Sequence, residues 1–194
     1  MLTLAPFGMR PLFHPTGLDR AHRYLNAIPS GHAFNLYKFA PVIIAADGTI
    51  QPAANGGDFK GIWGGIQYPD AFGRPTFVNN WISGTVLGTG PVWAFVWDAE
   101  DVVYEAQANG SITEAMIGDQ LNFSAVAGET PTSGSNLTGL STMALNATPV
   151  GVGNQGMVRI YDVQPRPDND WGDLFTIVQV QIARDQYVAN KVAI

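Results

Sequence analysis

The stretch PVIIAADGTIQPA, residues 41–53, decides the fold class of this chain. Two short apolar runs flank the dipeptide Asp47-Gly48. Asp-Gly between two such runs is typical of a two-residue β-hairpin turn, because glycine adopts the positive φ that this turn requires. The stretch therefore predicts an antiparallel hairpin.

Two further segments repeat this pattern. Residues 59–84, FKGIWGGIQYPDAFGRPTFVNNWISG, place a turn at 70–75 between two aromatic-rich runs. Residues 92–110, VWAFVWDAEDVVYEAQANG, alternate Val and Ala with Trp and Phe before a second turn near 99–101. Short alternating runs separated by turn residues predict two more hairpins, and the three together predict an antiparallel meander.

The remainder of the chain predicts further strands and one short helix. Ser111 and Glu114 have the spacing of a capping box, and Gly118 would end the helix that they begin. Strands are expected at 120–128, 140–147, 156–164 and 174–185, and the last is apolar enough for a central position in its sheet. We therefore predict an all-β fold, an antiparallel β-sandwich or a partly open β-barrel, with at most one short helix.

The first 23 residues have a different character. Three prolines and two glycines interrupt them, so neither a signal peptide nor a membrane-spanning segment is expected there. Phe7, Leu12 and Phe13 would be apolar anchors of a kind that a solvated tail seldom keeps. We predict an extended N-terminal arm over residues 1–23 and a single β-rich body over residues 24–194.

Charge is sparse and unevenly distributed. Only 13% of the residues are charged, cysteine is absent, and the formal net charge is −6. Residues 1–46 hold four basic residues against one acid, whereas the rest hold six against fifteen. Nucleic acid is not expected as a partner, because phosphate binding needs clustered Lys and Arg. A basic arm on an acidic body instead favours docking against another protein surface.

No catalytic or cofactor site can be assembled from the sequence. The stretch GVGNQG at 151–156 has the glycine spacing of a dinucleotide loop, but it leads into a predicted strand and not into a helix. The three histidines match no zinc spacing. Of the carboxylates Asp98, Glu100, Asp101 and Glu105, those at 98–101 fall at a predicted hairpin tip, where Asp is favoured for its backbone preferences. We expect no enzyme activity, no cofactor and no metal.

The stretch RPDNDWGDLF, residues 166–175, resembles a metal loop only at first sight. A calcium loop starting at Asp168 would need an acceptor at its fifth position, glycine at its sixth and glutamate at its twelfth, and these positions hold Gly172, Asp173 and Gln179. The stretch lies between two predicted strands, so we interpret it as a structural turn between them. We expect Trp171 to pack back on the sheet or a neighbour, while Asp168, Asp170, Gly172 and Asp173 close the turn.

Taken in order, several segments resemble the head decoration, or cement, proteins of tailed phages. The segments are APFGMRPLFHPTG, NLYKFAPVIIAADGTI, FKGIWGGIQY, VWAFVWDAEDVVYEAQ and RPDNDWGDLFTIVQVQI, which together span nearly the whole chain. The most specific of them are PFGMRP and RPDNDWGD.

The resemblance implies a structural virion protein and no catalytic residues. Such a protein would assemble in the host cytoplasm as a homo-oligomer, commonly a trimer, on the outer surface of the capsid, and would bridge neighbouring major capsid protein subunits. The capsid contacts that we expect in the arm are Phe7, Met9, Arg10, Leu12, Phe13, Arg20 and Arg23, with apolar anchors beside arginines that pair with an acidic surface.

The tryptophans suggest an alternative. Five of them could line the face of a carbohydrate-binding β-sandwich module on a virion surface, although aromatic residues at strand spacing are more often core or subunit interface.

Overall fold

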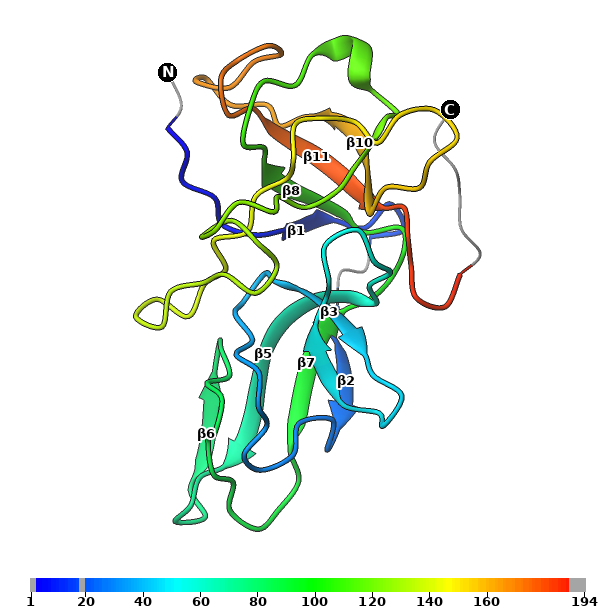
Figure 1. Ribbon diagram of the computed structural model, residues 1–194. Helices are drawn as coiled ribbons and strands as arrows, with labels where there is room; N and C mark the ends of the chain where they lie inside the picture. The colour runs from blue at the N-terminus through cyan, green and yellow to red at the C-terminus, as the bar shows by residue number, and fades with distance from the viewer. Residues whose placement is uncertain (1–2, 18–19, 189–194) are drawn as a thin grey trace.

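Two antiparallel sheets, packed together, make up the fold in a computed structural model that describes residues 3–17 and 20–188 (Figure 1). Sheet A has the strand order β1-β8-β11-β10-β9, and sheet B has the order β2-β7-β5-β3-β4, with β6 also pairing with β5. The predicted all-β fold is confirmed. The sheets do not close into a barrel, so the sandwich is the correct alternative.

The strands of sheet A come from distant parts of the chain. They are β1 (Arg10–Phe13), β8 (Val103–Gln107), β9 (Gln120–Leu121), β10 (Val158–Val163) and β11 (Ile177–Ile182). As predicted from its apolar character, β11 lies centrally, between β8 and β10.

Sheet B contains two of the predicted hairpins. Its strands are β2 (His22–Leu25), β3 (Pro41–Ile44), β4 (Ile50–Pro52), β5 (Gly61–Pro69), β6 (Pro75–Val78) and β7 (Trp93–Trp97). Strands β3 and β4 pair around Asp47-Gly48, where Gly48 has φ +80°, and β5 pairs with β6 around the turn at 70–74. Both turns therefore form where their Asp and Gly residues predict them.

The third predicted hairpin is wrong, and with it the meander. Strands β7 and β8 follow each other in the chain but belong to different sheets, so the turn at 99–102 carries the chain across the sandwich. Strand β7 alternates between buried and half-buried residues, whereas every residue of β8 is buried. A strand that is buried on both faces needs a sheet that is covered on both sides. Sheet A gives β8 such a position, whereas a position beside β7 in sheet B would leave one of its faces exposed.

Three smaller predictions also need correction. The expected helix is a single 3₁₀ turn, η1 (Glu114–Met116), and it begins after Thr113 and not after Ser111. Of the strand expected at 120–128, only β9 forms. Residues 140–147 form only isolated bridges and no strand, because their partners are short loop segments and not a continuous neighbouring strand.

Two hydrophobic clusters fill the molecule. The larger lies between the sheets and combines residues such as Tyr104 and Val178 of sheet A with Ile62 of sheet B and Phe59 just before it. The smaller lies on the opposite face of sheet B, which loops carrying residues such as Trp81 cover. Sheet B is thus covered on one face by loops and on the other face, at one end, by sheet A.

Candidate functional site

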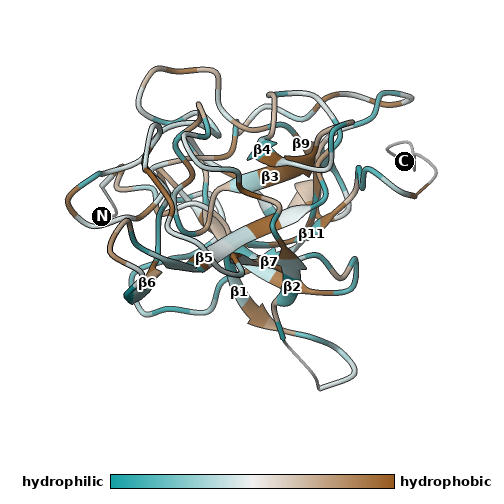
Figure 2. Cartoon of the chain, turned by 90° about the horizontal axis from the view of Figure 1, so that it is seen from below, coloured by the Kyte–Doolittle hydropathy of each residue, from teal (hydrophilic) through white to brown (hydrophobic). Residues whose placement is uncertain are grey.

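An open aromatic surface occupies the part of sheet B that sheet A does not cover. Strand register places Arg23 opposite Phe95 and Leu25 opposite Trp93, and it places Gln67 between Trp93 and Phe77. Residues directly opposite each other in antiparallel strands lie on the same face of a sheet. We call this surface the aromatic face and define it by Arg23, Leu25, Gln67, Phe77, Trp93 and Phe95; three of its strands, β2, β7 and β5, lie side by side in the view of Figure 2.

The side chains of the aromatic face contact one another and remain open to solvent. The Arg23 guanidinium lies 5.0 Å from the centre of the Trp93 ring, and the Phe77 and Phe95 rings lie 5.6 Å apart. Phe77 is 63% exposed and Leu25 is 54% exposed. On β7, Ala94 and Val96 alternate with Trp93 and Phe95, so they point to the other side of the sheet, where they are fully buried. A contiguous apolar surface of this kind is typical of an interaction site.

At the C-terminal end of β7, sheet A covers the face of sheet B that is exposed at Trp93. Trp97 packs against the core between the sheets, 6.1 Å from the Phe39 ring. Its indole lies over Gly64, where a β-carbon would come within 3.0 Å of the ring. The register shift between Trp63 and Gly65 places this glycine beneath the indole. The aromatic face thus ends where sheet A begins.

The arm residues expected at the capsid surface have diverse positions. Met9 is fully buried in the core, so it is removed from the set of surface contacts. Phe7 and Leu12 are half-buried, Phe13 is 40% exposed, Arg10 and Arg20 are exposed, and Arg23 belongs to the aromatic face.

The boundary at residue 23 also needs correction. Strand β1 pairs with β8 in sheet A, and β2 pairs with β7 in sheet B, so residues 10–13 and 22–23 are edge strands of the body. Prolines at 6, 11 and 15 made this segment look unlike a strand, but an edge position tolerates proline because one side of the strand needs no hydrogen bonds. Residues 18–19 lie outside the described residues.

A buried carboxylate on β8 binds two arginines, one on the neighbouring strand β1 and one in the loop after β10. Glu105 is completely buried and forms ion pairs with Arg10 of β1 and with Arg166, whose Nη2 donates to Oε2 over 2.6 Å. Burial is the main cause that lowers the pKa of Arg10, and the nearby charge of Arg166 is the second. The sequence pattern groups Glu105 with the nearby carboxylates at 98–101, a grouping that does not predict its burial. Its place in the apolar run from Val102 to Ala108 was the signal that it would be buried and paired.

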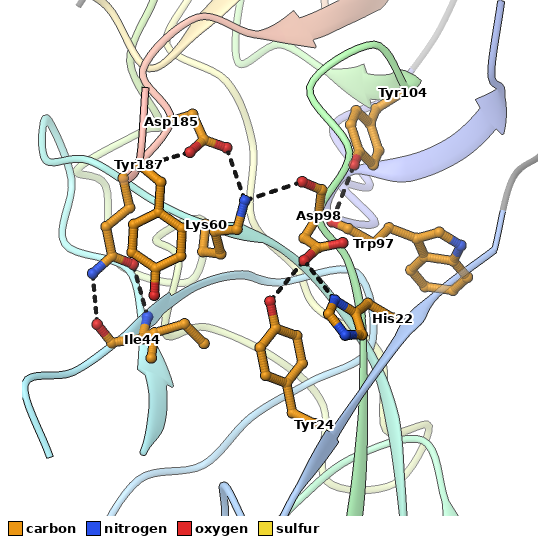
Figure 3. Close-up of polar contacts among 10 residues, drawn as sticks. His22, Tyr24, Ile44, Lys60, Trp97, Asp98, Tyr104, Asp185 and Tyr187 are labelled. Carbon is orange, nitrogen blue, oxygen red and sulfur yellow. Dashed lines mark hydrogen bonds and ion pairs between the residues drawn. The ribbon is translucent and has the colours of Figure 1, made fainter. Parts of the chain in front are cut away.

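A second polar cluster lies at the junction of the sheets (Figure 3). The Asp98 carboxylate at the end of β7 accepts a hydrogen bond from the Tyr24 hydroxyl over 2.6 Å and lies 3.2 Å from Nδ1 of His22. Burial is the main cause that raises the pKa of Tyr24, and the hydrogen bond to Asp98 is the second. Beside them, Lys60 Nζ donates to the Asp98 carbonyl and to Asp185. The cluster ties β2 to the end of β7 and the segment after β11 to the residue before β5, which is a structural role.

The segment 166–175 forms turns between β10 and β11, and the residue with the most side-chain hydrogen bonds in it, Asn169, is not among those predicted. Asn169 is buried and donates through Nδ2 to the carbonyls of Gln164 and Ile177 over 2.7 and 2.8 Å, while its Oδ1 accepts from the Ile177 amide over 2.8 Å. The side chain thereby joins the end of β10 to the start of β11 as a strand backbone would. The sequence does not predict this role, because Asn169 lies between Asp168 and Asp170, and Asn and Asp both favour turns.

The other turn residues behave in different ways. The Asp173 carboxylate accepts from the Asp170 amide over 2.9 Å, and Gly172 has φ +85°. Trp171 is half-buried against the core, which confirms that it packs back on the protein. Asp168 is exposed.

The five tryptophans do not form one platform. Trp63 and Trp81 are buried, Trp97 and Trp171 pack on the core between the sheets, and only Trp93 belongs to the aromatic face. Arg23 covers one side of its indole.

Over residues 3–17 and 20–188, no group of three or more His, Cys, Asp or Glu side chains is arranged to hold a metal ion. Within the same ranges, no helix has the length and apolar character needed to span a membrane. No protein-family model matches the chain, and neither the curated proteins nor the solved structures contain a match.

Proposed function

We propose that this protein is a structural component of a tailed-phage virion that decorates the outer surface of the capsid and bridges neighbouring major capsid protein subunits. The observation that carries the proposal is the aromatic face, an exposed apolar surface in a sheet whose other face packs against a hydrophobic cluster under loops. Aromatic residues and arginine are enriched where proteins bind proteins, because they bury much area at little entropic cost.

The charge at the margin of this surface supports a protein partner. Strand β2 forms the edge of sheet B and carries His22 and Arg23, with Arg20 exposed just before it. The partner surface would therefore combine apolar pockets with acidic residues around them.

The surface is also rigid before binding. Ladder hydrogen bonds on β5 and β7 fix the positions of Trp93 and Phe95, and the Phe77 ring is held against Phe95. Binding therefore requires little ordering of the backbone. Repetition of the contact over many identical copies would strengthen attachment further. A trimer would multiply such contacts on a shell.

The proposal is tested by co-sedimentation with expanded shells of the major capsid protein encoded in the same genome. We expect the wild-type protein to sediment with the shells and the double variant Trp93→Ser/Phe77→Ser to remain in the supernatant. Tyr161→Ser, which removes a half-exposed aromatic side chain from β10 of sheet A, is the matched control and should sediment like the wild type.

Two outcomes would count against the proposal. If the wild-type protein does not sediment with the shells, the decoration role is wrong. If the double variant sediments as fully as the wild type, the aromatic face is not the contact. Native mass spectrometry of the free protein, with a trimer as the expected species, tests the oligomer separately.

A further inference from the structure

An open groove of about 450 Å³ lies between the end of β6 and a loop that is distant in sequence. Residues 77–80 form one wall, and residues 136–139 form the other. Neither wall contributes a charged side chain. The groove therefore differs from the aromatic face, which includes Arg23, although Phe77 belongs to both.

The same short segment, residues 36–38, supports both walls. Leu36 exchanges backbone hydrogen bonds of 2.9 and 2.7 Å with Trp81, directly after the first wall. Lys38 donates its amide to the Gly139 carbonyl over 2.9 Å and accepts from the Ser141 amide over 2.9 Å. Because one segment fixes both sides, the width of the groove is set by backbone hydrogen bonds.

A glycine keeps the groove open. Gly139 has φ +71°, and a β-carbon there would lie 3.1 Å from Oδ1 of Asn80 and 3.5 Å from the β-carbon of Asn79. A side chain at this position would therefore press on the first wall. The glycine satisfies the left-handed backbone and preserves the space between the walls.

Three asparagine amides line the groove, on Asn79, Asn80 and Asn136. Oδ1 of Asn136 accepts from the Tyr37 hydroxyl over 2.6 Å, which fixes this amide and leaves its two N–H groups as donors. Oδ1 of Asn79 similarly accepts from Lys38 Nζ over 3.5 Å. The side-chain amide of Asn80 has a donor and an acceptor in one plane, so it can form hydrogen bonds with two neighbouring hydroxyl groups of a ligand.

An exposed ring adjoins these amides. Phe77 lines the groove and is 63% exposed, so an apolar ligand face can stack on it. Planar amides beside one aromatic ring, with no charged side chain in the lining, suit a ligand that is neutral, rich in hydroxyl groups and apolar on one face. A pyranose ring has all three properties.

We propose that this groove binds a neutral hexose unit of an oligosaccharide. Asn80 and Asn136 hydrogen-bond the hydroxyl groups of the sugar, and Phe77 stacks on its C–H face. The site does not use the tryptophans, and it does not depend on capsid binding.

The test uses the full chain, labelled with a fluorophore, on an array of neutral and charged oligosaccharides. Titration calorimetry with the neutral hexose oligosaccharide that binds best then gives dissociation constants for the variants. We expect Asn80→Ala and Asn136→Ala each to weaken binding about tenfold, as the loss of one or two ligand hydrogen bonds predicts. Asn154→Ala, on the remote loop before β10, is the control and should bind like the wild type. Thermal melting confirms that each variant is folded, and Phe77→Leu, which removes the exposed stacking ring and should also weaken binding, replaces any variant that is not.

Three results would overturn the inference. The first is that no neutral oligosaccharide binds. The second is that only charged glycans bind. The third is that a neutral oligosaccharide binds equally well to the groove variants and loses its affinity in Trp93→Ala, which would move the site to the aromatic face.

Discussion

Arg166 donates a 2.6 Å hydrogen bond to the fully buried carboxylate of Glu105, so the loop after β10 is tied to β8, an inner strand of sheet A. We expect Arg166→Ala to lower the free energy of unfolding by about 2 kcal/mol. This is below the roughly 3–5 kcal/mol of a broken buried pair, because Arg10 still compensates the charge. Urea denaturation measures the change. Arg159→Ala, which removes a surface guanidinium from β10, should cost less than about 0.5 kcal/mol. Equal costs for the two variants would show that the pair with Glu105 contributes nothing.

Asn169→Ala should destabilise the protein by about 3 kcal/mol. The variant leaves the Ile177 amide and two carbonyl groups without their side-chain partner at a buried position. Asp168→Ala changes the preceding, exposed residue and should be nearly neutral. Chemical denaturation of both variants decides whether the amide or the neighbouring carboxylates hold the turn.

Gly8→Ala should cost about 3 kcal/mol or more, because two penalties combine. Gly8 has φ +78°, and a β-carbon there would lie 2.3 Å from the Phe39 carbonyl oxygen. Gly17→Ala carries only the first penalty, since Gly17 has φ +86° with open space around it, and it should cost about 1 kcal/mol. The difference between the midpoints of unfolding of the two variants measures the cost of the contact between a β-carbon at residue 8 and the Phe39 carbonyl oxygen. It also tests why glycine stands in the segment PFGMRP.

Local chemistry explains which parts of the fold could be predicted from the sequence. The hairpins around Gly48 and Gly73 depend on turn residues, and both are correct. The crossing from β7 to β8 depends on which sheet buries a strand on both faces, and alternation along one strand does not carry that information. The aromatic face, likewise, required knowing that sheet A covers Trp97 and leaves Trp93 open. Of the expected arm contacts, Arg23 is on this face, whereas Met9 is in the core.

Stability at alkaline pH should depend on Tyr24. Burial and the hydrogen bond to Asp98 raise the pKa of its hydroxyl above the ordinary value of about 10. The folded state therefore holds this proton more tightly than the unfolded state does. The resulting stabilisation is complete below pH about 10 and is lost as the pH rises from there through the folded pKa. We expect the free energy of unfolding to fall above pH about 10 in the wild type and to fall less steeply in Tyr24→Phe. Denaturation at several pH values tests this, and equal slopes would contradict it.

The N-terminal segment should behave as part of the core and not as a detachable arm. Met9 is fully buried, and its amide donates to the Phe39 carbonyl over 2.9 Å, so Met9→Ala should cost about 2–5 kcal/mol. Phe13→Ala, at the 40% exposed end of β1, which directly follows Met9, should cost only about 1 kcal/mol. Deleting residues 1–23 would remove β1 and half of β2, so loss of capsid binding in that deletion would not distinguish a missing contact from a disrupted fold. Point variants make the distinction, because Phe13→Ala and Arg20→Ala leave the core intact. If Met9→Ala were neutral in urea denaturation, the segment would be an arm that rests on the body without stabilising it.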